Sequence, residues 1–466
     1  MTADVTFHLA RLLAATRHAD LPASALEATH RSILDWLGSA LAGAAERPAR
    51  LARQIVTRLG TSDEATVFGG GRASAALAAL ANGVASHVLE LDDIHKGSTV
   101  HGAAPIVPAA LAVAEREHAD GRAFMTAVAV GYEAALRVGE AVNPDHYRYW
   151  HPTGTAATFG AAAAAGSLLC LNTDEMVDAL GSAGTQAAGL WEFNADGAMS
   201  KHLHPGKAAF NGVLSADLAR AGFTGARRIL EGERGFFRAM SARHDPTRIT
   251  DGLGRSWKIC ENGFKLHACC GHTHTAIDAA LDLRSARRWS AEDVLAHVVD
   301  VHVETYGPGY EIVKEPVPRS PYQGQFSMAY CVTAALLDGQ VGLDQFAAER
   351  FGADGVRDAK LAALLGRVRV TVAGDLTGRY PSAWPARLTL TLRDGERVQG
   401  ASDYPKGNQE NPVSTCELEA KLTSLVGSRI GPGTSGRALA AVRSIEACPD
   451  MAGAFRDVWA DAVPER

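Results

Sequence analysis

The sequence predicts a mainly α-helical protein with two domains, one all-helical and a smaller one that mixes helices and strands. Three observations lead to this fold class. The chain of 466 residues is long for a single core, since domains average roughly 150 residues. The first half repeats a helical spacing of apolar residues, and strand-like alternation starts only after about Pro246. The composition, 47% hydrophobic and 21% charged, is that of an ordinary globular protein.

The first half predicts one helix after another. Residues 25–43, 72–91 and 123–142 each place apolar side chains three or four positions apart, which is the period of a helix face. In the last of these, Glu133 and Arg137 are spaced to form an ion pair across one helical turn. Residues 154–171 are mostly Ala and Gly, which partition weakly into lipid, so we interpret them as a buried helix and not as a membrane span.

The second half predicts strands. Residues 296–306, 366–375 and 386–400 alternate apolar and polar side chains, and Asp394-Gly395 is a hairpin turn signal. After Asn411-Pro412 the helical pattern returns in residues 414–426. We therefore place an all-helical domain at 1–262, rejoined by 411–466, and an α+β domain at 263–410.

Composition also limits the partners and the compartment. The formal net charge of −6, without a basic tail or stripe, argues against nucleic acid or an anionic membrane as the partner. The seven cysteines have no framework spacing, and the N-terminus lacks the features of a signal peptide, so we expect a reduced, cytoplasmic protein.

Two local motifs are weak. Gly69, Gly70 and Gly71 precede a helix but match neither nucleotide-binding fingerprint, so we expect a flexible lead-in to the helix, with a nucleotide oxidoreductase as a remote alternative. The stretch HACCGHTH at 267–274 gathers soft ligands, but adjacent cysteines fit no structural zinc pattern and no iron–sulfur set is complete. We expect no metal and no cofactor.

Four polar clusters carry more information. Each places titratable side chains in a turn that leads into an apolar helix, where backbone N–H groups favour an anion. Their sequences are LELDDIHKGSTVHG (with Asp92, Asp93, His95 and His101), NPDHYRYWHPTG (Tyr147, Tyr149 and His151), MSKHLHPGK (Lys201, His202, His204 and Lys207) and NGFKLHACCG (Lys265). Their recurrence predicts that they converge on one pocket.

Such a pocket suits proton chemistry on a carboxylate. Lysines neutralise carboxylates, and His101 and His151 transfer protons near neutral pH. Removing a proton next to a carboxylate creates a high-energy dianion, which positioned cations stabilise. The residues therefore point to elimination or epimerisation of a small polycarboxylate. A protein that binds a carboxylate without turning it over remains an alternative.

The chain resembles the MmgE/PrpD family. The resemblance rests on eight segments that occur in order between about residue 30 and residue 422: DWLGSALAG, AALANGVASHVLELDD, HGAAPIVPAALA, HPTGTAATFGAAAAA, MSKHLHPGKAA, FKLHACCGHTHTAIDA, QFSMAYCVTAAL and YPKGNQENPVS. The family includes 2-methylcitrate dehydratase, cis-aconitate decarboxylase and iminodisuccinate epimerase. The resemblance implies a homodimer, a site between a large helical domain and a smaller lid, and lyase or isomerase chemistry without metal or cofactor.

The resemblance also assigns residues. Asp93, His101, His151 and Lys265 fall on acid/base positions of the family motifs, and Tyr147 is a further proton-transfer candidate. The two basic positions of the K-x-L-H-P-G-[KR] motif, which are expected to bind substrate carboxylates, are Lys201 and Lys207.

Three departures concern the substrate. His267-Ala268 replaces the Tyr-Pro that often follows the family lysine, and Ile94-His95 replaces Thr-Trp or Thr-His after the Asp pair. Cys270 stands where the decarboxylase branch carries a histidine, which disfavours decarboxylation. We therefore expect a 2-methylcitrate dehydratase-like hydro-lyase, with an epimerase or a decarboxylase as alternatives.

Overall fold

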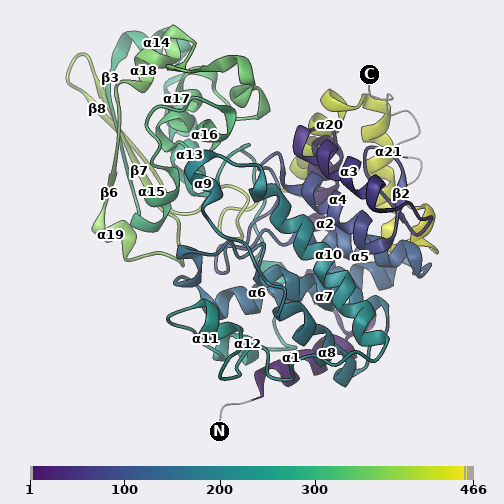
Figure 1. Cartoon of the computed structure of the whole chain (residues 1–466). Helices are drawn as coiled ribbons and strands as arrows, with labels where there is room; N and C mark the ends of the chain where they lie inside the picture. The colour runs from purple at the N-terminus through teal and green to yellow at the C-terminus, as the bar shows by residue number, and fades with distance from the viewer. Residues whose placement is uncertain (1–3, 456–457, 459–466) are drawn as a thin grey trace. The chain divides into compact units, whose positions relative to one another are not determined.

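A computed structural model describes residues 4–455 and 458 and confirms a mainly α-helical fold (Figure 1). The chain divides into two compact units. Unit 1 comprises Met1–Val88, Asp92–Asn262 and Ser414–Arg466, and unit 2 comprises Leu89–Leu91 and Gly263–Val413. The ends of the predicted first domain, 1–3, 456–457 and 459–466, lie outside the described residues. The short segment 89–91 belongs to unit 2 although its neighbours on both sides belong to unit 1.

Unit 1 is built of long helices around α7 (Ala156–Leu168), which contacts α5, α6, α8 and α10. All but one of the residues of α7 are buried, which explains its Ala/Gly composition. The other long helices of this unit are α1 (Val5–Ala15), α2 (Ala23–Gly43), α3 (Arg47–Leu59), α4 (Ala75–His87), α5 (Ala103–Arg116), α6 (Gly121–Val142), α8 (Thr173–Gly184), α10 (Ser200–Arg220), α20 (Thr415–Arg429) and α21 (Pro432–Arg443). Helix α20 belongs to unit 1, where it packs against α2.

Small residues allow α6 and α7 to approach closely. A Cβ added to Gly160 of α7 would lie 2.6 Å from the carbonyl oxygen of Gly131 of α6. Real Cβ atoms do not approach a backbone oxygen so closely, so glycine is required at this crossing. Glu133 and Arg137 of α6 form the predicted ion pair, which is buried.

Two of the helices of unit 1 begin after a predicted polar cluster. His101 precedes α5 and His151 precedes α7, so the predicted polar turn before an apolar helix is confirmed for these two clusters. The third cluster differs from the prediction, because Lys201 and Lys207 lie inside α10, in its first eight residues.

Unit 2 contains a four-stranded sheet with the strand order β6-β3-β7-β8. Strand β3 pairs parallel with β6 and antiparallel with β7, and a hairpin at Gly395 joins β7 to β8. Helices α13 (His274–Arg287) and α17 (Met328–Asp338) contact the sheet, and Figure 1 shows the helices of unit 2 gathered on one side of it. The strands are β3 (Val298–Thr305), β6 (Val368–Val372), β7 (Ala386–Leu392) and β8 (Arg397–Ser402), at the predicted positions.

Shorter elements complete unit 2. A second, two-stranded sheet pairs β4 with β5. The remaining elements are β4 (Phe351–Gly352), β5 (Gly355–Val356), α14 (Ala291–His297), α15 (Gly307–Val313), α16 (Pro321–Gln325), α18 (Ala359–Leu365) and α19 (Gly374–Thr377).

The glycine cluster differs from the prediction of a helix lead-in. Strands β1 (Ala65–Thr66) and β2 (Arg72–Ala73) pair antiparallel, and Gly69, Gly70 and Gly71 form the turn between them with positive φ angles. Left-handed backbone at three successive positions favours glycine, which accounts for the motif without a bound phosphate. Unit 1 is therefore not strictly all-helical.

Two further observations concern the whole described chain. None of the described helices combines the length and the apolar character that crossing a lipid bilayer requires. All seven cysteines, which lie within the described residues, carry free thiols.

Candidate active site

One carboxylate of unit 1 lies between two imidazoles. His87 Nδ1 is 2.6 Å from Asp92 Oδ2, and His101 Nδ1 is 3.3 Å from the same oxygen. The rings of the two histidines are 4.8 Å apart. His87 is the last residue of α4, and His101 follows a tight loop closed by a β-bridge between His95 and Val100. All three side chains are buried.

Further histidines extend this pair. The ring of His151 lies 5.6 Å from that of His87 and 6.0 Å from that of His101. Its Nδ1 is 3.1 Å from Nδ1 of His204, which lies on α10. We call the following residues the histidine cluster: His87, Asp92, His101, His151, Lys201, His202 and His204.

The charges of the cluster fall into two kinds. Burial raises the pKa of Asp92, but the imidazoles of His87 and His101 outweigh this effect and hold it well below its usual range. Burial lowers the pKa of His151 well below its ordinary value, and the positive charges of neighbouring His204, His87 and Lys201 lower it further. Burial, with Lys207, lowers the pKa of His204 to about 3. The cluster thus combines an ionised carboxylate, Asp92, with two imidazoles, those of His151 and His204, that are neutral near pH 7.

Lys201 brings a positive charge to this cluster. It is the second residue of α10 and is 2% exposed. Its charge acts on both His151 and His204. A lysine in the first turn of a helix, where backbone N–H groups are unpaired, forms a favourable environment for an anion.

Tyr147 lies at the edge of the cluster. Its ring contacts that of Trp191 edge to face at 5.1 Å, and Trp191 contacts His151 at the same separation. Trp191 therefore contacts both Tyr147 and His151. Phe193 packs against Trp191, His151 and His204 and completes an aromatic wall.

Asp93 faces a different set of groups from its neighbour Asp92. Its carboxylate accepts hydrogen bonds from Tyr132 Oη, from Asn262 Nδ2 and from the backbone N–H of Ala103, the first residue of α5. Burial raises the pKa of Asp93 to about 7, and the charge of Asp92 adds to this effect. Asp93 therefore both caps α5 and holds a proton that is exchangeable near neutral pH.

Lys207 is committed to the backbone. Its ammonium donates to the carbonyl oxygens of Gly154, Gln186 and Ala188 at 3.2, 3.2 and 2.9 Å. These three bonds use all three N–H donors of a lysine. Burial lowers the pKa of Lys207 to about 8. In this conformation Lys207 ties α10 to the start of the Gly154 turn.

Lys265 belongs to unit 2. It is 1% exposed, and its ammonium lies 3.2 Å from the carbonyl oxygen and 3.3 Å from the carboxylate of Glu90. Glu90 adopts a left-handed backbone conformation, with φ of 57°, and precedes Asp92 by two residues in the chain. The salt bridge therefore anchors the segment that leads directly into the Asp92-Asp93 pair.

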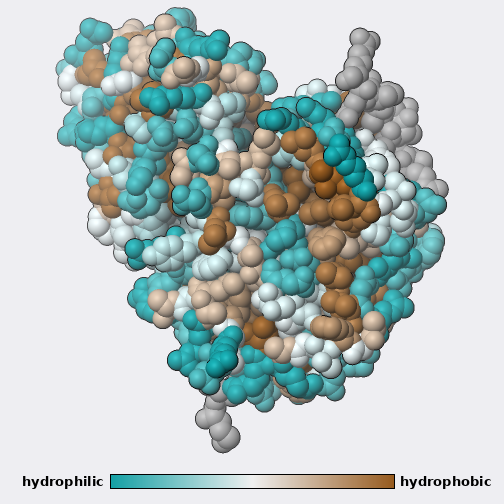
Figure 2. Space-filling model, in the orientation of Figure 1, coloured by the Kyte–Doolittle hydropathy of each residue, from teal (hydrophilic) through white to brown (hydrophobic). Residues whose placement is uncertain are grey.

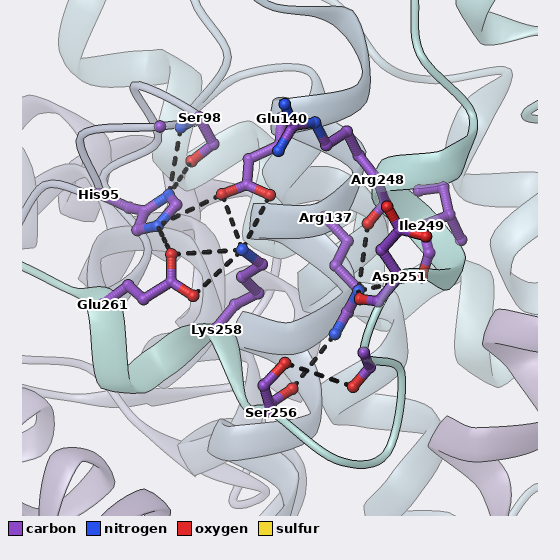
Figure 3. Close-up of polar contacts among 12 residues, drawn as sticks. His95, Ser98, Arg137, Glu140, Arg248, Ile249, Asp251, Ser256, Lys258 and Glu261 are labelled. Atoms are coloured by element: carbon purple, nitrogen blue, oxygen red, sulfur yellow. Dashed lines mark hydrogen bonds and ion pairs between the residues drawn. The ribbon is translucent and has the colours of Figure 1, made fainter. Parts of the chain in front are cut away.

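A second polar network holds the loop before His101 (Figure 3). Lys258 Nζ lies 3.1 Å from a carboxylate oxygen of both Glu140 and Glu261, and His95 Nε2 lies 3.7 and 3.6 Å from the same two groups. His95 Nδ1 contacts Ser98 Oγ at 2.9 Å. Burial opposes ionisation of Glu261, but His95 and Lys258 lower its pKa to about 2. We call His95, Glu140, Lys258 and Glu261 the loop-anchor cluster.

Beside this network, Figure 3 shows Arg137 directed at backbone carbonyls. Its guanidinium donates to Arg248 O, Ile249 O, Asp251 O and Ser256 O. These bonds attach residues 248–256, the segment that leads to Lys258, to helix α6. The position of Lys258 in the loop-anchor cluster is therefore fixed relative to α6.

Two sets of three residues could supply metal ligands, because their ligand atoms lie within 4.8 Å of one another: His87, His101 and His151, and His95, Glu140 and Glu261. In the second set Lys258 already occupies the position of a cation. In the first set the positive charge of Lys201 acts on His151. A fixed ammonium repels a metal cation, so both arrangements favour other occupants. Within the described residues, HACCGHTH contributes no such set.

The structure thus brings together His101, His151 and Lys201, with Tyr147 behind Trp191 and Asp93 directed elsewhere in the same unit. The sequence analysis missed His87. The residue ends an apolar helix, where a histidine is usually part of the core, and only its spacing of five residues from Asp92 signals a partner.

Comparison with known proteins adds an independent observation. Residues 7–249 match the MmgE/PrpD N-terminal domain, and residues 267–447 match the MmgE/PrpD C-terminal domain. The chain is 29% identical to a cis-aconitate decarboxylase-like protein of Aspergillus oryzae over 96% of both chains. It is 30% identical to a cis-aconitate decarboxylase of Aspergillus terreus over 88% of this chain and 86% of that protein. It is 27% identical to the human cis-aconitate decarboxylase over 91% and 88% of the two chains. The two domain matches and these near full-length relatives establish that the chain belongs to the MmgE/PrpD family.

Proposed function

We propose that the protein is a cofactor-independent carboxy-lyase that acts on a small tricarboxylate of the cis-aconitate type. The histidine cluster carries this proposal, because it gathers buried imidazoles and the ammonium of Lys201 around one ionised carboxylate. The names of the relatives favour decarboxylation over the dehydration that the sequence analysis preferred.

Substrate binding is assigned to Lys201 and the N-terminus of α10, which offer positive charge to a carboxylate. We further propose that Lys265, which is paired with Glu90, contributes to catalysis. Lys207, which the sequence analysis assigned to substrate binding, is assigned instead to holding the Gly154 turn beside His151.

The reaction needs an electron sink and an acid. In cis-aconitate, one carboxylate is attached to a CH2 group that is itself attached to the double bond. When this carboxylate leaves as CO2, the electrons of the broken C–C bond form a new double bond at the former CH2 carbon. The electrons of the old double bond move to the carbon beside a second carboxylate. That carbon then takes up one proton, so the reaction consumes a proton and releases CO2. Cations near the second carboxylate stabilise the intermediate charge, and a positioned acid supplies the proton.

We assign the proton donor to His101, since the adjacent Asp92 carboxylate stabilises an imidazolium. His151, which is neutral at pH 7, is assigned to hydrogen bonding with the substrate or transfer of a proton to His204. Asp93 is proposed as a proton reserve, because its pKa is about 7. Tyr147 acts through Trp191, as a support for the wall beside His151.

The experiment is a substrate panel with purified protein treated with EDTA. We expect CO2 release from cis-aconitate, and loss of most of this activity in Lys265→Ala while the variant remains folded by circular dichroism. Turnover of 2-methylcitrate or iminodisuccinate with no CO2 from cis-aconitate would overturn the decarboxylase assignment. An unchanged rate in Lys265→Ala would remove Lys265 from the mechanism.

A hydro-lyase acting on 2-methylcitrate is the second candidate. Cys270 stands where the decarboxylase branch of the family carries a histidine, and the buried carboxyl of Asp93 is suited to protonate a leaving hydroxyl. Dehydration is recognised by an ultraviolet-absorbing alkene without CO2. An epimerase, like a hydro-lyase, would remove a proton from the carbon beside a carboxylate. It would return a proton to the other face of that carbon, so that only the optical rotation changes.

We also propose that the protein forms a homodimer. Leu51, Ile55 and Leu59 expose 41, 49 and 64% of their surface along one face of α3. Figure 2 shows hydrophobic residues gathered where Figure 1 places α3 and α4. We expect sedimentation analysis to give twice the chain mass and Ile55→Glu to weaken the association; a monomer at micromolar concentration would contradict the proposal.

A further inference from the structure

Asp92 and Asp93 are adjacent in the chain but serve different parts of unit 1. Asp92 Oδ2 is shared by His87 and His101, whereas its Oδ1 has no hydrogen-bond partner among residues 4–455 and 458. Asp93 contacts neither histidine through a hydrogen bond or ion pair, and both of its oxygens are already bonded to Tyr132, Asn262 and Ala103. Only one of the two carboxylates is therefore placed to act on His101.

The position of Asp92 follows from the elements around it. His87 is the last residue of α4, and the chain reaches Asp92 five residues later. The loop after Asp92 is held by the loop-anchor cluster and by the left-handed backbone of Thr99, with φ of 52°. The loop therefore brings His101 back beside Asp92, the residue at which the loop starts.

We propose that Asp92, shared with His87, is the positioning residue that orients His101 and sets its protonation state. This proposal rests on the proposed function, in which His101 supplies the proton. Nδ1 of the His101 ring lies 3.3 Å from Asp92 Oδ2, so Nε2 is the nitrogen assigned to the substrate.

The surroundings of His101 explain why the carboxylate is needed. The titratable groups placed beside the ring are His87 from α4 and His151 from the turn before α7, with ring centroids 4.8 and 6.0 Å away. Lys201 of α10 adds its positive charge to His151. Asp92 is the carboxylate beside the ring, 3.3 Å from Nδ1, and its negative charge stabilises an imidazolium at His101.

His87 moderates this effect. It takes part of the hydrogen-bonding capacity of the same oxygen that faces His101, and its contact, at 2.6 Å, is the shorter of the two. Removing His87 leaves the oxygen entirely to His101, which strengthens the stabilisation of the imidazolium. Substitutions of Asp92 and of His87 therefore shift the titration of His101 in opposite directions. If Asp92 only stabilised the fold, substitutions of Asp92 and of His87 would not shift the titration of His101 in opposite directions.

The experiment titrates His101 by NMR in protein labelled with 13C-histidine, without substrate. In Asp92→Asn we expect the titration midpoint of His101 to fall by about one to three pH units, because a nearby opposite charge is lost. In His87→Gln, whose neutral amide cannot carry charge and binds the shared oxygen more weakly than an imidazolium does, we expect the midpoint to rise. His101→Gln identifies the signal, and His30→Gln, on α2, is a matched control that leaves the midpoint unchanged.

Kinetics give a second readout. Asp92→Asn should lower kcat for CO2 release from cis-aconitate by about 100-fold or more, with a much smaller change in KM. Asp92→Glu, which restores the charge but not the distance, should return the titration midpoint towards the native value. If Asp92→Asn does not fold, His87→Gln still tests the proposal, because an unchanged or lowered midpoint of His101 in that variant would overturn it.

The outcomes separate this proposal from the proposed function. Opposed shifts in a protein that releases no CO2 from any substrate would support the role of Asp92 and overturn the proposed reaction. Unchanged midpoints in both Asp92→Asn and His87→Gln would overturn the role of Asp92, even in an active decarboxylase. Shifts in the same direction would also overturn it.

Discussion

The side-chain amide of Asn262 donates a hydrogen bond to Asp93 Oδ2 over 2.7 Å. Asn262 is the last residue of unit 1 before the chain enters unit 2. Asp93 also receives hydrogen bonds from Tyr132 and from the N-terminus of α5. One buried carboxyl therefore joins α5, α6 and the exit of the chain from unit 1, and its burial is the main reason that its pKa rises to about 7.

The first prediction concerns the proton on Asp93. We expect infrared difference spectra to show a buried protonated carboxyl at pH 5.5 that disappears as the pH rises through about 7. Because the folded-state pKa lies above the value of 3.8 for a free Asp, this group destabilises the fold as pH rises from about 4 to 7. The band should be absent in Asp93→Asn. A band that persists in that variant, or no band at pH 5.5, would contradict the prediction.

The second prediction compares two lysines of α10. Lys201→Met should reduce kcat/KM for the carboxylate substrate by about 100-fold with little change in stability, because a charge-assisted hydrogen bond is lost. Lys207→Met should instead lower the free energy of unfolding by about 1–3 kcal/mol, because three carbonyl oxygens lose their donor. Urea unfolding and initial rates measure the two effects. If Lys201→Met lowered the stability and Lys207→Met lowered kcat/KM, then Lys207 would be the substrate-binding lysine and Lys201 the structural one.

The third prediction tests the loop-anchor cluster. Lys258→Met leaves Glu140 and Glu261 facing each other without their shared cation and should destabilise the protein. Adding Glu140→Gln removes one of the two charges, so the double variant should recover part of the lost stability. A double-mutant cycle in urea measures this coupling. Additive effects would show that the carboxylates do not depend on Lys258.

The fourth prediction concerns acid sensitivity. His146 bonds to Met240 O and Thr155 Oγ1, and burial lowers its pKa to about 4 from the ordinary 6.5. Between these values the unfolded chain binds a proton that the native protein does not, so stability rises with pH by up to about 3 kcal/mol. His146→Gln should reduce the difference between the unfolding midpoints at pH 4.5 and pH 7. The control His30→Gln should not, and an equal effect of the two variants would contradict the prediction.

Much of the fold could be predicted from the sequence because burial imposes a period on it. The apolar spacing of residues 123–142 predicted α6, and the alternation of Val301 and Val303 predicted β3. Val299, predicted on the same face, is exposed instead, because the strand register shifts between Val298 and Asp300. The polar turns before α5 and α7 could also be located, because titratable residues directly precede an apolar run, whereas the segment from Lys201 to Lys207 is itself the start of α10. Family membership, suggested by eight ordered segments, is confirmed by the domain matches.

The details of the site could not be predicted, because they depend on which way a side chain faces. Nothing in the sequence distinguishes Asp92 from Asp93, yet one contacts imidazoles and the other caps a helix. The commitment of Lys207 to three carbonyls depends on the path of residues 186–188. The loop-anchor cluster joins three segments that are distant in the chain, and no local pattern connects them.

The most direct test of the account follows the proton. Protein treated with EDTA is mixed with cis-aconitate in D2O, and the product is examined by NMR while CO2 is measured. The account predicts one CO2 and one carbon-bound deuterium per product molecule, with both lost together in His101→Gln and in Lys201→Met. Product without solvent deuterium, or full activity in either variant, would contradict it.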